Sequence, residues 1–184
     1  SFTPGGTFYT INGNTKLDEN NNGCDAADAV IPNFKFSITN GTNTGEIISN
    51  DSGNYFIPVT SGTQTITPSF ENPAYFNVSP SNVSVTFPGG TSPFGQNFCV
   101  TPNGVHNDLE IAIVPVDAAR PGFNSTYKII YKNKGNQTQS GSISLAFNDA
   151  VLDFVNANPA VASQVSNTLN WDYVNLTPLE SREI

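Results

Sequence analysis

The sequence contains no methionine and few charged residues. Lys and Arg total 7 and Asp and Glu total 15, which leaves a net charge of −8 at pH 7. Nucleic acids and anionic lipid surfaces are bound through a basic face, so this balance argues against both partners. No apolar run is long enough to span a bilayer, and we expect no membrane insertion. The missing methionine indicates a processed or excised piece of a larger protein.

Groups that could carry catalysis are also scarce. The single histidine, His106, lies beside Asn107 and Asp108, and a catalytic triad would need a serine brought to it across the fold. No G-x-S-x-G nucleophile motif occurs, and the histidine and cysteine content is too low for a zinc site. Asp149 and Asp153 could in principle form a glycosidase pair, but solvated loop acids are the simpler interpretation. The sequence therefore predicts a protein that is not an enzyme.

Helix signals are nearly absent, whereas strand signals recur along the whole chain. No window repeats apolar residues at helical spacing, and 13 prolines interrupt the sequence. Segments of alternating apolar and polar residues are separated by turn clusters rich in Gly, Asn and Pro, as in a β-sandwich. The expected strands are 7–13, 34–40, 45–50, 54–59, 64–70, 82–87, 95–100, 108–116, 125–135, 142–148, 151–156, 168–176 and 181–184.

The segment 101–108 contains Pro, Gly and Asn and divides these strands into two sets. We therefore expect an all-β protein built from two tandem β-sandwich domains of immunoglobulin-like or prealbumin-like type. The domains would be residues 1–101 and 109–184, with a linker at 102–108. Because the segment 181–184 begins a strand and then stops, we expect the second domain to be truncated at its C-terminus.

The chain has two cysteines, Cys24 and Cys99. One widely separated pair in a chain rich in Thr, Asn and Gly is typical of an exported protein with a single structural disulfide. Two buried free thiols are the alternative. A bridge across so long a loop would stabilise the fold by about 4 kcal/mol in the chain-entropy model, a large share of a small domain's stability.

The densest cluster of carboxylates and carboxamides is KLDENNNGCDAAD, residues 16–28. Asp18, Asn20 and Asn22 stand at alternate positions and are followed by Gly23. This matches positions one, three, five and six of an EF-hand-type loop, where alternate oxygen atoms face a hard cation and the glycine permits a sharp turn. The pattern therefore predicts a calcium loop, here between strands instead of helices.

The rest of the loop departs from the EF-hand pattern. The carbonyl group of Cys24 would supply the seventh position, but the ninth and twelfth positions are Ala26 and Ala29. Asp25 and Asp28 would then have to provide the remaining oxygen atoms. An empty, solvated polar turn is the alternative, although crowded carboxylates repel one another without a cation. If calcium binds, an affinity of about 0.1–1 mM is expected.

The first half resembles a known family of repeats. GNTKLDENNNGCDAADAVIPNFKFSI, residues 13–38, is similar to the start of the calcium-binding SdrD B-like repeats of bacterial surface adhesins. TGEIISNDSGNYFIPVTSGTQTITP, residues 44–68, is similar to the sandwich core that these repeats share with Cna B-type and transthyretin-like modules. The cysteine pair resembles the variant in secreted multidomain proteins of Bacteroidetes-type bacteria. The Cna-type similarity also raises a Lys–Asn isopeptide bond between Lys16 and Asn97, although no acid is clearly placed between them.

The second half resembles a different family. DLEIAIVPVDAARPGFNSTYKIIYKNKGNQTQSGSISLAFNDAVLDFV, residues 108–155, is similar to adhesin-associated immunoglobulin-like repeats of unknown function. LNWDYVNLTPLESREI, residues 169–184, resembles their penultimate strand, the following turn and the start of the last strand. This resemblance implies a fold and a location at the cell surface, and it implies almost nothing about ligands.

Together these features predict a non-catalytic structural and adhesion module of a large secreted or cell-surface bacterial protein, stiffened by calcium and a disulfide. Its expected partners are neighbouring modules of the same polypeptide and an extracellular protein or glycan. The alternative is a carbohydrate-binding accessory module of a secreted polysaccharide-degrading enzyme. Trp171 and Tyr173 share one face of their strand and could form a sugar platform, or they could belong to the core of the second domain.

Overall fold

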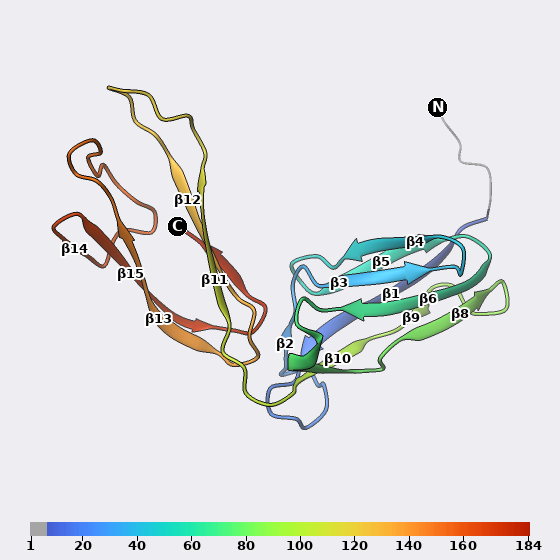
Figure 1. Ribbon diagram of the computed structural model, residues 1–184. Helices are drawn as coiled ribbons and strands as arrows, with labels where there is room; N and C mark the ends of the chain where they lie inside the picture. Colours follow the sequence, from blue (N-terminus) through green and yellow to red (C-terminus); the bar gives the residue numbers. More distant parts are fainter. Residues whose placement is uncertain (1–6) are drawn as a thin grey trace. The chain divides into compact units, whose positions relative to one another are not determined.

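The computed structural model describes residues 7–184, which form two compact units that divide between Gly104 and Val105 (Figure 1). Both units are built from β-strands, and the one helical element among the described residues is a short 3-10 turn, η1 (Pro73–Tyr75). Within residues 7–184, no helix is long and apolar enough to cross a membrane. The all-β class with two tandem sandwich units is thus confirmed.

The first unit contains two sheets. One has the strand order β4-β3-β6-β8, and the other has the order β2-β1-β10-β7, with β5 and β9 also paired to β1. The strands of the first unit are β1 (Tyr9–Leu17), β2 (Ala29–Val30), β3 (Lys35–Thr39), β4 (Thr44–Ile48), β5 (Asn54–Val59), β6 (Gly62–Ser69), β7 (Phe76–Ser79), β8 (Val83–Phe87), β9 (Phe94–Gly95) and β10 (Phe98–Pro102).

Strand β1 changes partners along its length. Its first part pairs antiparallel with β5 and parallel with β9, whereas residues Thr15–Leu17 pair parallel with β10 and antiparallel with β2. The change occurs after Asn14, next to Gly13, where a Cβ atom would lie 1.6 Å from the carbonyl oxygen of Gln96. Only glycine lets the two backbones approach this closely.

Aromatic side chains fill the space between the two sheets of the first unit. Phe36 on β3 is fully buried, and its ring centroid lies 4.7 Å from that of Tyr55 on β5 and 5.5 Å from that of Phe98 on β10. Burial raises the pKa of the Tyr55 hydroxyl, which donates a hydrogen bond to the carbonyl oxygen of Gln96. The alternation that predicted these strands thus places one face of each in the core, as expected for a sandwich.

The second unit contains two three-stranded sheets, with the orders β11-β12-β16 and β13-β15-β14. Its strands are β11 (Leu109–Pro115), β12 (Tyr127–Asn133), β13 (Gln139–Ala146), β14 (Ser163–Val165), β15 (Thr168–Leu176) and β16 (Ser181–Glu183). The core joins both sheets, because Ile129 on β12 packs in one cluster with Ile143 on β13 and with Leu169 and Trp171 on β15. β11 contributes no buried residue.

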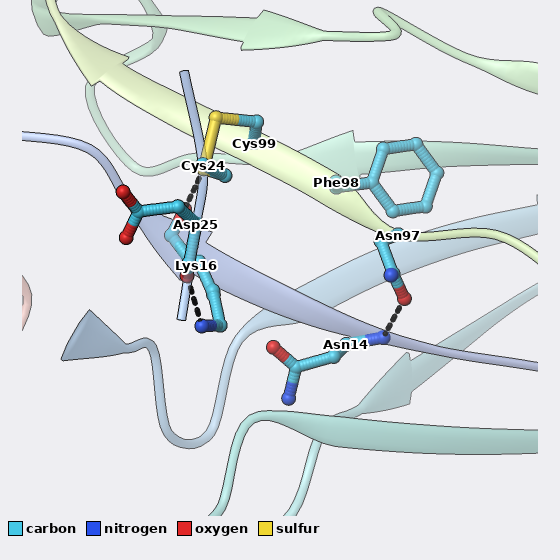
Figure 2. A pocket seen from close by; sticks show the side chains of 7 residues that line it. All are labelled: Asn14, Lys16, Cys24, Asp25, Asn97, Phe98 and Cys99. Carbon is cyan, nitrogen blue, oxygen red and sulfur yellow. Dashed lines mark hydrogen bonds between the residues drawn. A yellow bond between two sulfur atoms is a disulfide. The ribbon is translucent and has the colours of Figure 1, made fainter. Parts of the chain in front are cut away.

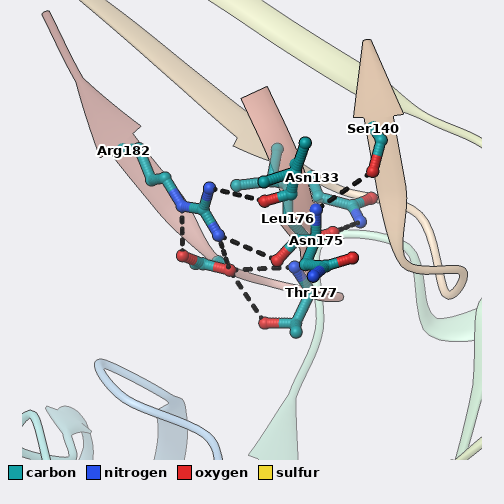
Figure 3. A network of polar contacts seen from close by, with 8 residues as sticks. Asn133, Ser140, Asn175, Leu176, Thr177 and Arg182 are labelled. Carbon is teal, nitrogen blue, oxygen red and sulfur yellow. Dashed lines mark hydrogen bonds and ion pairs between the residues drawn. The ribbon is translucent and has the colours of Figure 1, made fainter. Parts of the chain in front are cut away.

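A buried asparagine holds the end of β12 in place (Figure 3). The Asn133 side chain donates hydrogen bonds to the carbonyl oxygens of Gln137 (2.8 Å) and Leu176 (3.0 Å) and accepts one from the amide of Gly135 (3.0 Å). Beside it, the Arg182 guanidinium donates to the carbonyl oxygen of Asn175 at 2.8 Å. One side chain therefore bonds to three backbone groups, on Gly135, Gln137 and Leu176, and ties the end of β12 to the end of β15.

Arg182 also binds Glu180, whose pKa is lowered. Burial alone would raise the pKa of this carboxyl group, but hydrogen bonds from Arg182 and Thr177 stabilise the charged form and outweigh it. The pair closes the turn between β15 and β16.

Some expected boundaries differ from those observed. Residues 151–156, expected as a strand, form a loop, in which the amides of Val151 and Leu152 both donate to the carbonyl oxygen of Asn148 and so close a turn. The segment 105–108 belongs to the second unit: the amides of Lys134 and Gly135 donate to the Asp108 carbonyl oxygen. The short strands β2, β7 and β14 were not expected.

Candidate functional site

The loop between β1 and β2 carries the predicted calcium motif, and Asp18 organises it. Asp18 follows the last residue of β1 and is only 1% exposed, and its amide donates to the Val100 carbonyl oxygen of β10 at 2.8 Å. Its carboxylate accepts hydrogen bonds from the amides of Asn22 (3.2 Å) and Gly23 (2.8 Å). Asn21 and Gly23 have positive φ angles, 58° and 94°, which wrap the backbone around this carboxylate.

The other polar side chains of the loop bind its own backbone. The Asn20 side-chain oxygen accepts from the amide of Asn22 (3.1 Å), and Asp28 accepts from the amide of Asp25 (2.7 Å). Asp25 in turn accepts from the amide of Ala27 at 2.7 Å. These are local Asx-type turns, which Asp and Asn form without help from an ion.

The three aspartates of the predicted ligand set, Asp18, Asp25 and Asp28, do not gather around one point. Within residues 7–184, no three His, Cys, Asp or Glu side chains lie close enough together to hold a metal ion. Asp18 faces the fifth and sixth positions of the loop, as the motif requires, whereas Asp25 and Asp28 are turned toward amides of residues 25–28. Calcium binding at this loop therefore stays a prediction, and it requires Asp25 and Asp28 to reorient.

The predicted disulfide joins Cys24 of this loop to Cys99 of β10, with a Cα–Cα distance of 5.6 Å (Figure 2). Cys99 lies opposite Lys16 in the parallel β1–β10 pairing, so the bridge fixes the loop against the strand next to the one it leaves. A hollow of about 500 Å³ lies beside the bridge. Its lining residues are Asn14, Lys16, Cys24, Asp25, Asn97, Phe98 and Cys99.

Lys16 and Asn97, the pair raised for an isopeptide bond, both line this hollow but have different partners. The Lys16 ammonium donates to the carbonyl oxygen of Asp25, and the side-chain oxygen of Asn97 accepts from the amide of Asn14 at 2.9 Å (Figure 2). The Lys16 amine and the Asn97 carboxamide are thus hydrogen-bonded to different partners and not to each other.

Trp171 and Tyr173 belong to the interior of the second unit. Trp171 is 4% exposed, and its indole N–H donates to the carbonyl oxygen of Pro159 at 3.1 Å. Tyr173 is half-buried, with its ring centroid 5.6 Å from that of Tyr131. Of the two roles that the sequence left open for this pair, a sugar platform or core residues, their burial and packing agree with the core.

An exposed face that sequence reasoning missed lies on β1 and β5. Phe56 is 67% exposed and pairs across the strands with Asn12, while Asn14 pairs with Asn54. These side chains, with Asn97, line a shallow hollow of about 610 Å³. The sequence did contain a pattern that indicates this face. Alternation in YTINGN places Asn12 and Asn14 on one face of β1, and alternation in NYFIPV places Phe56 on the outward face of β5.

The remaining titratable candidates do not form a catalytic group. His106 is half-buried, and its backbone exchanges hydrogen bonds with Asn136 of the second unit. Asp149 and Asp153 are exposed at the loop after β13.

Comparisons with known proteins give no family. No protein-family model and no curated protein matches the sequence. Among solved structures, the shaft pilin SpaA of Lactobacillus rhamnosus GG aligns over 56% of this chain and 54% of its own, at 8% identity and a TM-score of 0.43. A DUF3823 family protein of Bacteroides ovatus ATCC 8483 aligns over 97% of this chain and 81% of its own, at 12% identity and a TM-score of 0.40.

The full-length RrgB pilus protein of Streptococcus pneumoniae aligns over 95% of this chain and 44% of its own, at 9% identity and a TM-score of 0.42. The chain thus spans about half the length of the shaft pilin and less than half of RrgB. Likenesses at these identities and TM-scores carry no argument about family or function. Membership of the SdrD B-like repeats therefore stays a prediction.

Proposed function

We propose that the chain is a non-catalytic structural and adhesion module of a larger extracellular or cell-surface protein. The observation that carries this proposal is the Cys24–Cys99 bridge, because structural disulfides form and persist in oxidising compartments outside the cytosol. The fold supports it as well. Each sandwich is filled by its own apolar side chains, so both units serve as compact spacers whose working surfaces lie on the outside.

The perturbed pKa values agree with a role without catalysis. They belong to Tyr55, in the first core, and to the Glu180–Arg182 pair, which closes a turn in the second unit. Each has a structural hydrogen-bond partner, and the two sets lie in different units. Acid–base catalysis needs such groups gathered around one cleft.

Calcium binding at the β1–β2 loop is a second part of the proposal. The oxygen atoms of Asp18, Asn20 and Asn22, with the Cys24 carbonyl, would supply the first positions, and Asp25 and Asp28 would complete the site. Oxygen ligands of this kind suit calcium, and a loop tied down by a disulfide loses less entropy on binding.

Calcium at 10 mM is expected to raise the melting temperature of the first unit by roughly 5 °C relative to EDTA, for a dissociation constant of about 1 mM. The Asp18→Asn variant should lose this calcium-dependent shift, whatever its own baseline stability. The matched control is Asp149→Asn, in an exposed loop of the second unit. Equal melting curves with calcium and with EDTA for the wild type would rule out the site.

The exposed face around Phe56 favours a second candidate function, glycan binding. An open aromatic ring can stack on the C–H face of a sugar, and carboxamides can bond to hydroxyl groups on both sides. Phe56 is flanked by Asn12 and Asn54, and the hollow that they line is open to solvent. This face replaces the β15 platform as the site that a carbohydrate-binding module would use.

A glycan array separates the two functions. A pure spacer is expected to bind no polysaccharide, whereas a carbohydrate-binding module is expected to bind one and to lose at least tenfold in affinity on Phe56→Ala, because the stacking surface is removed. Phe123→Ala is the matched control, since Phe123 is equally exposed but lies in the second unit. Binding that depends on Phe56 would show that the first unit is a carbohydrate-binding module and not only a structural spacer.

A further inference from the structure

Strand β11 is the longest strand of residues 7–184 in which every residue is exposed. All seven of its residues, Leu109–Pro115, are exposed, and four of them carry large aliphatic side chains: Leu109, Ile111, Ile113 and Val114. Ile111 is 57% exposed and Ile113 is 52% exposed. An uncovered aliphatic strand is a recognised pairing hazard and a mark of an interaction surface.

One edge of β11 has no strand beside it. In the sheet order β11-β12-β16, β11 pairs with β12 and with no other strand of residues 7–184. The Asp108 carbonyl oxygen accepts from the amide of Lys134, just after β12, and the Val116 amide donates to the carbonyl oxygen of Thr126, just before β12. The even-numbered residues between Asp108 and Val116 therefore direct their N–H and C=O groups toward β12. Because alternate residues of an antiparallel strand face opposite edges, the N–H and C=O groups of Leu109, Ile111 and Ile113 point away from β12.

Pro115 marks the end of this outward-facing run. It lies opposite Tyr127 and has the same parity as Ile111 and Ile113, so its nitrogen also faces the open edge. A proline has no N–H to donate, and an edge position is where that loss costs nothing. The segment that can accept a further strand is therefore Leu109–Ile113.

The side chains of the open edge point toward the interior of the sandwich. Ile113 lies directly opposite Ile129, and Ile111 lies opposite Tyr131. Ile129 is buried and Tyr131 packs against the same core cluster, so Ile111 and Ile113 are on the core face of the sheet. Their exposure means that the opposite sheet, β13-β15-β14, does not extend over β11. The core is open along this strand.

We propose that β11 pairs with β11 of a second copy of this chain, antiparallel and centred on Ile111. In this register Ile111 lies opposite Ile111 of the second copy, and Leu109 lies opposite its Ile113. Each outward N–H then meets an outward C=O, which gives about six hydrogen bonds and leaves Pro115 outside the paired segment. The two sheets become one, with both core faces on the same side.

The charges of β11 allow this pairing. Glu110 would face Ala112 of the second copy, and Asp108 would face its Val114, so no two acidic side chains lie directly opposite each other. Glu110 is also compensated within its own chain, because Lys134 lies 2.9 Å from its carboxylate. The same segment therefore provides the donors, the acceptors, the apolar surface and the charge pattern that it requires in a partner. Any extended strand offers the donors and acceptors, but a second copy also brings aliphatic side chains opposite Leu109, Ile111 and Ile113 and no acid opposite Asp108 or Glu110.

Sedimentation between 1 and 200 µM tests the proposal on the whole chain. We expect the weight-average mass to rise from 19.6 kDa towards twice that value with concentration. Ile111→Lys and Ile111→Glu should each weaken the association at least tenfold, since the register puts like charges directly opposite each other. An equimolar mixture of the two variants should associate again, because the introduced lysine of one chain would then face the introduced glutamate of the other.

Val174→Lys is the matched control, because Val174 on β15 is 65% exposed and lies away from the β11 edge. It should associate like the wild type, and melting curves check that every variant is folded. A wild-type chain that stays at 19.6 kDa throughout would overturn the proposal. Failure of the Lys–Glu mixture to associate, or association of Ile111→Lys alone, would overturn the pairing centred on Ile111.

Discussion

Replacing Cys24 and Cys99 together with serine is expected to lower the free energy of unfolding of the first unit by about 4 kcal/mol. The bridge closes a loop with a sequence separation of 75 residues, and the chain-entropy model assigns this value to a loop of that size. Because small domains are stable by only about 5–15 kcal/mol, such a loss is a large fraction of the total. Urea denaturation followed by far-UV circular dichroism measures it, once the transition of the second unit has been identified separately.

The second unit contains the internal control for this experiment. Trp171 is the only tryptophan and lies in the second core, so its fluorescence reports that unit separately. Its transition should not move on replacement of the cysteines. A native disulfide usually contributes well over ~1 kcal/mol to stability. If the free energy of unfolding of the first unit fell by less than about 1 kcal/mol, β1, β10 and the Asp18 loop would be held together without the bridge.

Asn133→Ala is expected to destabilise the second unit by about 3 kcal/mol. The substitution leaves the carbonyl oxygens of Gln137 and Leu176 without the donor that Asn133 provides, and the amide of Gly135 keeps only its hydrogen bond to the Asp108 carbonyl oxygen. Asn133 is fully buried, and each buried polar group left unsatisfied costs about 1–3 kcal/mol, partly relieved when water enters. Thermal or urea unfolding, followed by the fluorescence of Trp171, measures the loss.

Asn156→Ala is the matched control, because Asn156 is exposed in the loop between β13 and β14. Its effect should stay within about 0.5 kcal/mol, as for ordinary surface substitutions. If the two variants were equally stable, the three hydrogen bonds of Asn133 would contribute nothing to the second unit. Asn133→Leu separates packing from bonding, because it keeps a side chain of similar size but removes both donors and the acceptor without burying a charge.

The strands and their inward faces were largely predictable because alternation is a local property of the sequence. NYFIPV predicted β5 with the correct face, since Tyr55, Ile57 and Val59 are buried. VLDFVN looked similar but forms a loop, in which Phe154 alone packs against the core. The difference is tertiary: no strand in the described part of the chain lies beside residues 151–156 to accept their backbone hydrogen bonds.

The polar contacts were less predictable because they join residues that are distant in sequence. Nothing in the sequence indicates that Asn133 would meet Leu176, or that Gly13 would lie against the backbone of Gln96. The motif at Asp18 was predictable, since its hydrogen bonds to Asn22 and Gly23 are local. The orientation of Asp25 and Asp28 was not, because local turns compete with a shared ligand site for the same oxygen atoms.

The parallel pairing of β1 and β10 has a mechanical consequence. Because Thr15, Lys16 and Leu17 lie beside Phe98, Cys99 and Val100 in the same direction, the polypeptide comes into the first unit at one end and leaves it at the other. Tension along the polypeptide then loads the β1–β10 hydrogen bonds in shear, all at once instead of one after another. If they fail, the Cys24–Cys99 bridge still carries the force and keeps the 75-residue span between its cysteines out of the extending chain. The withheld length is on the order of 250 Å at about 3.4 Å per residue.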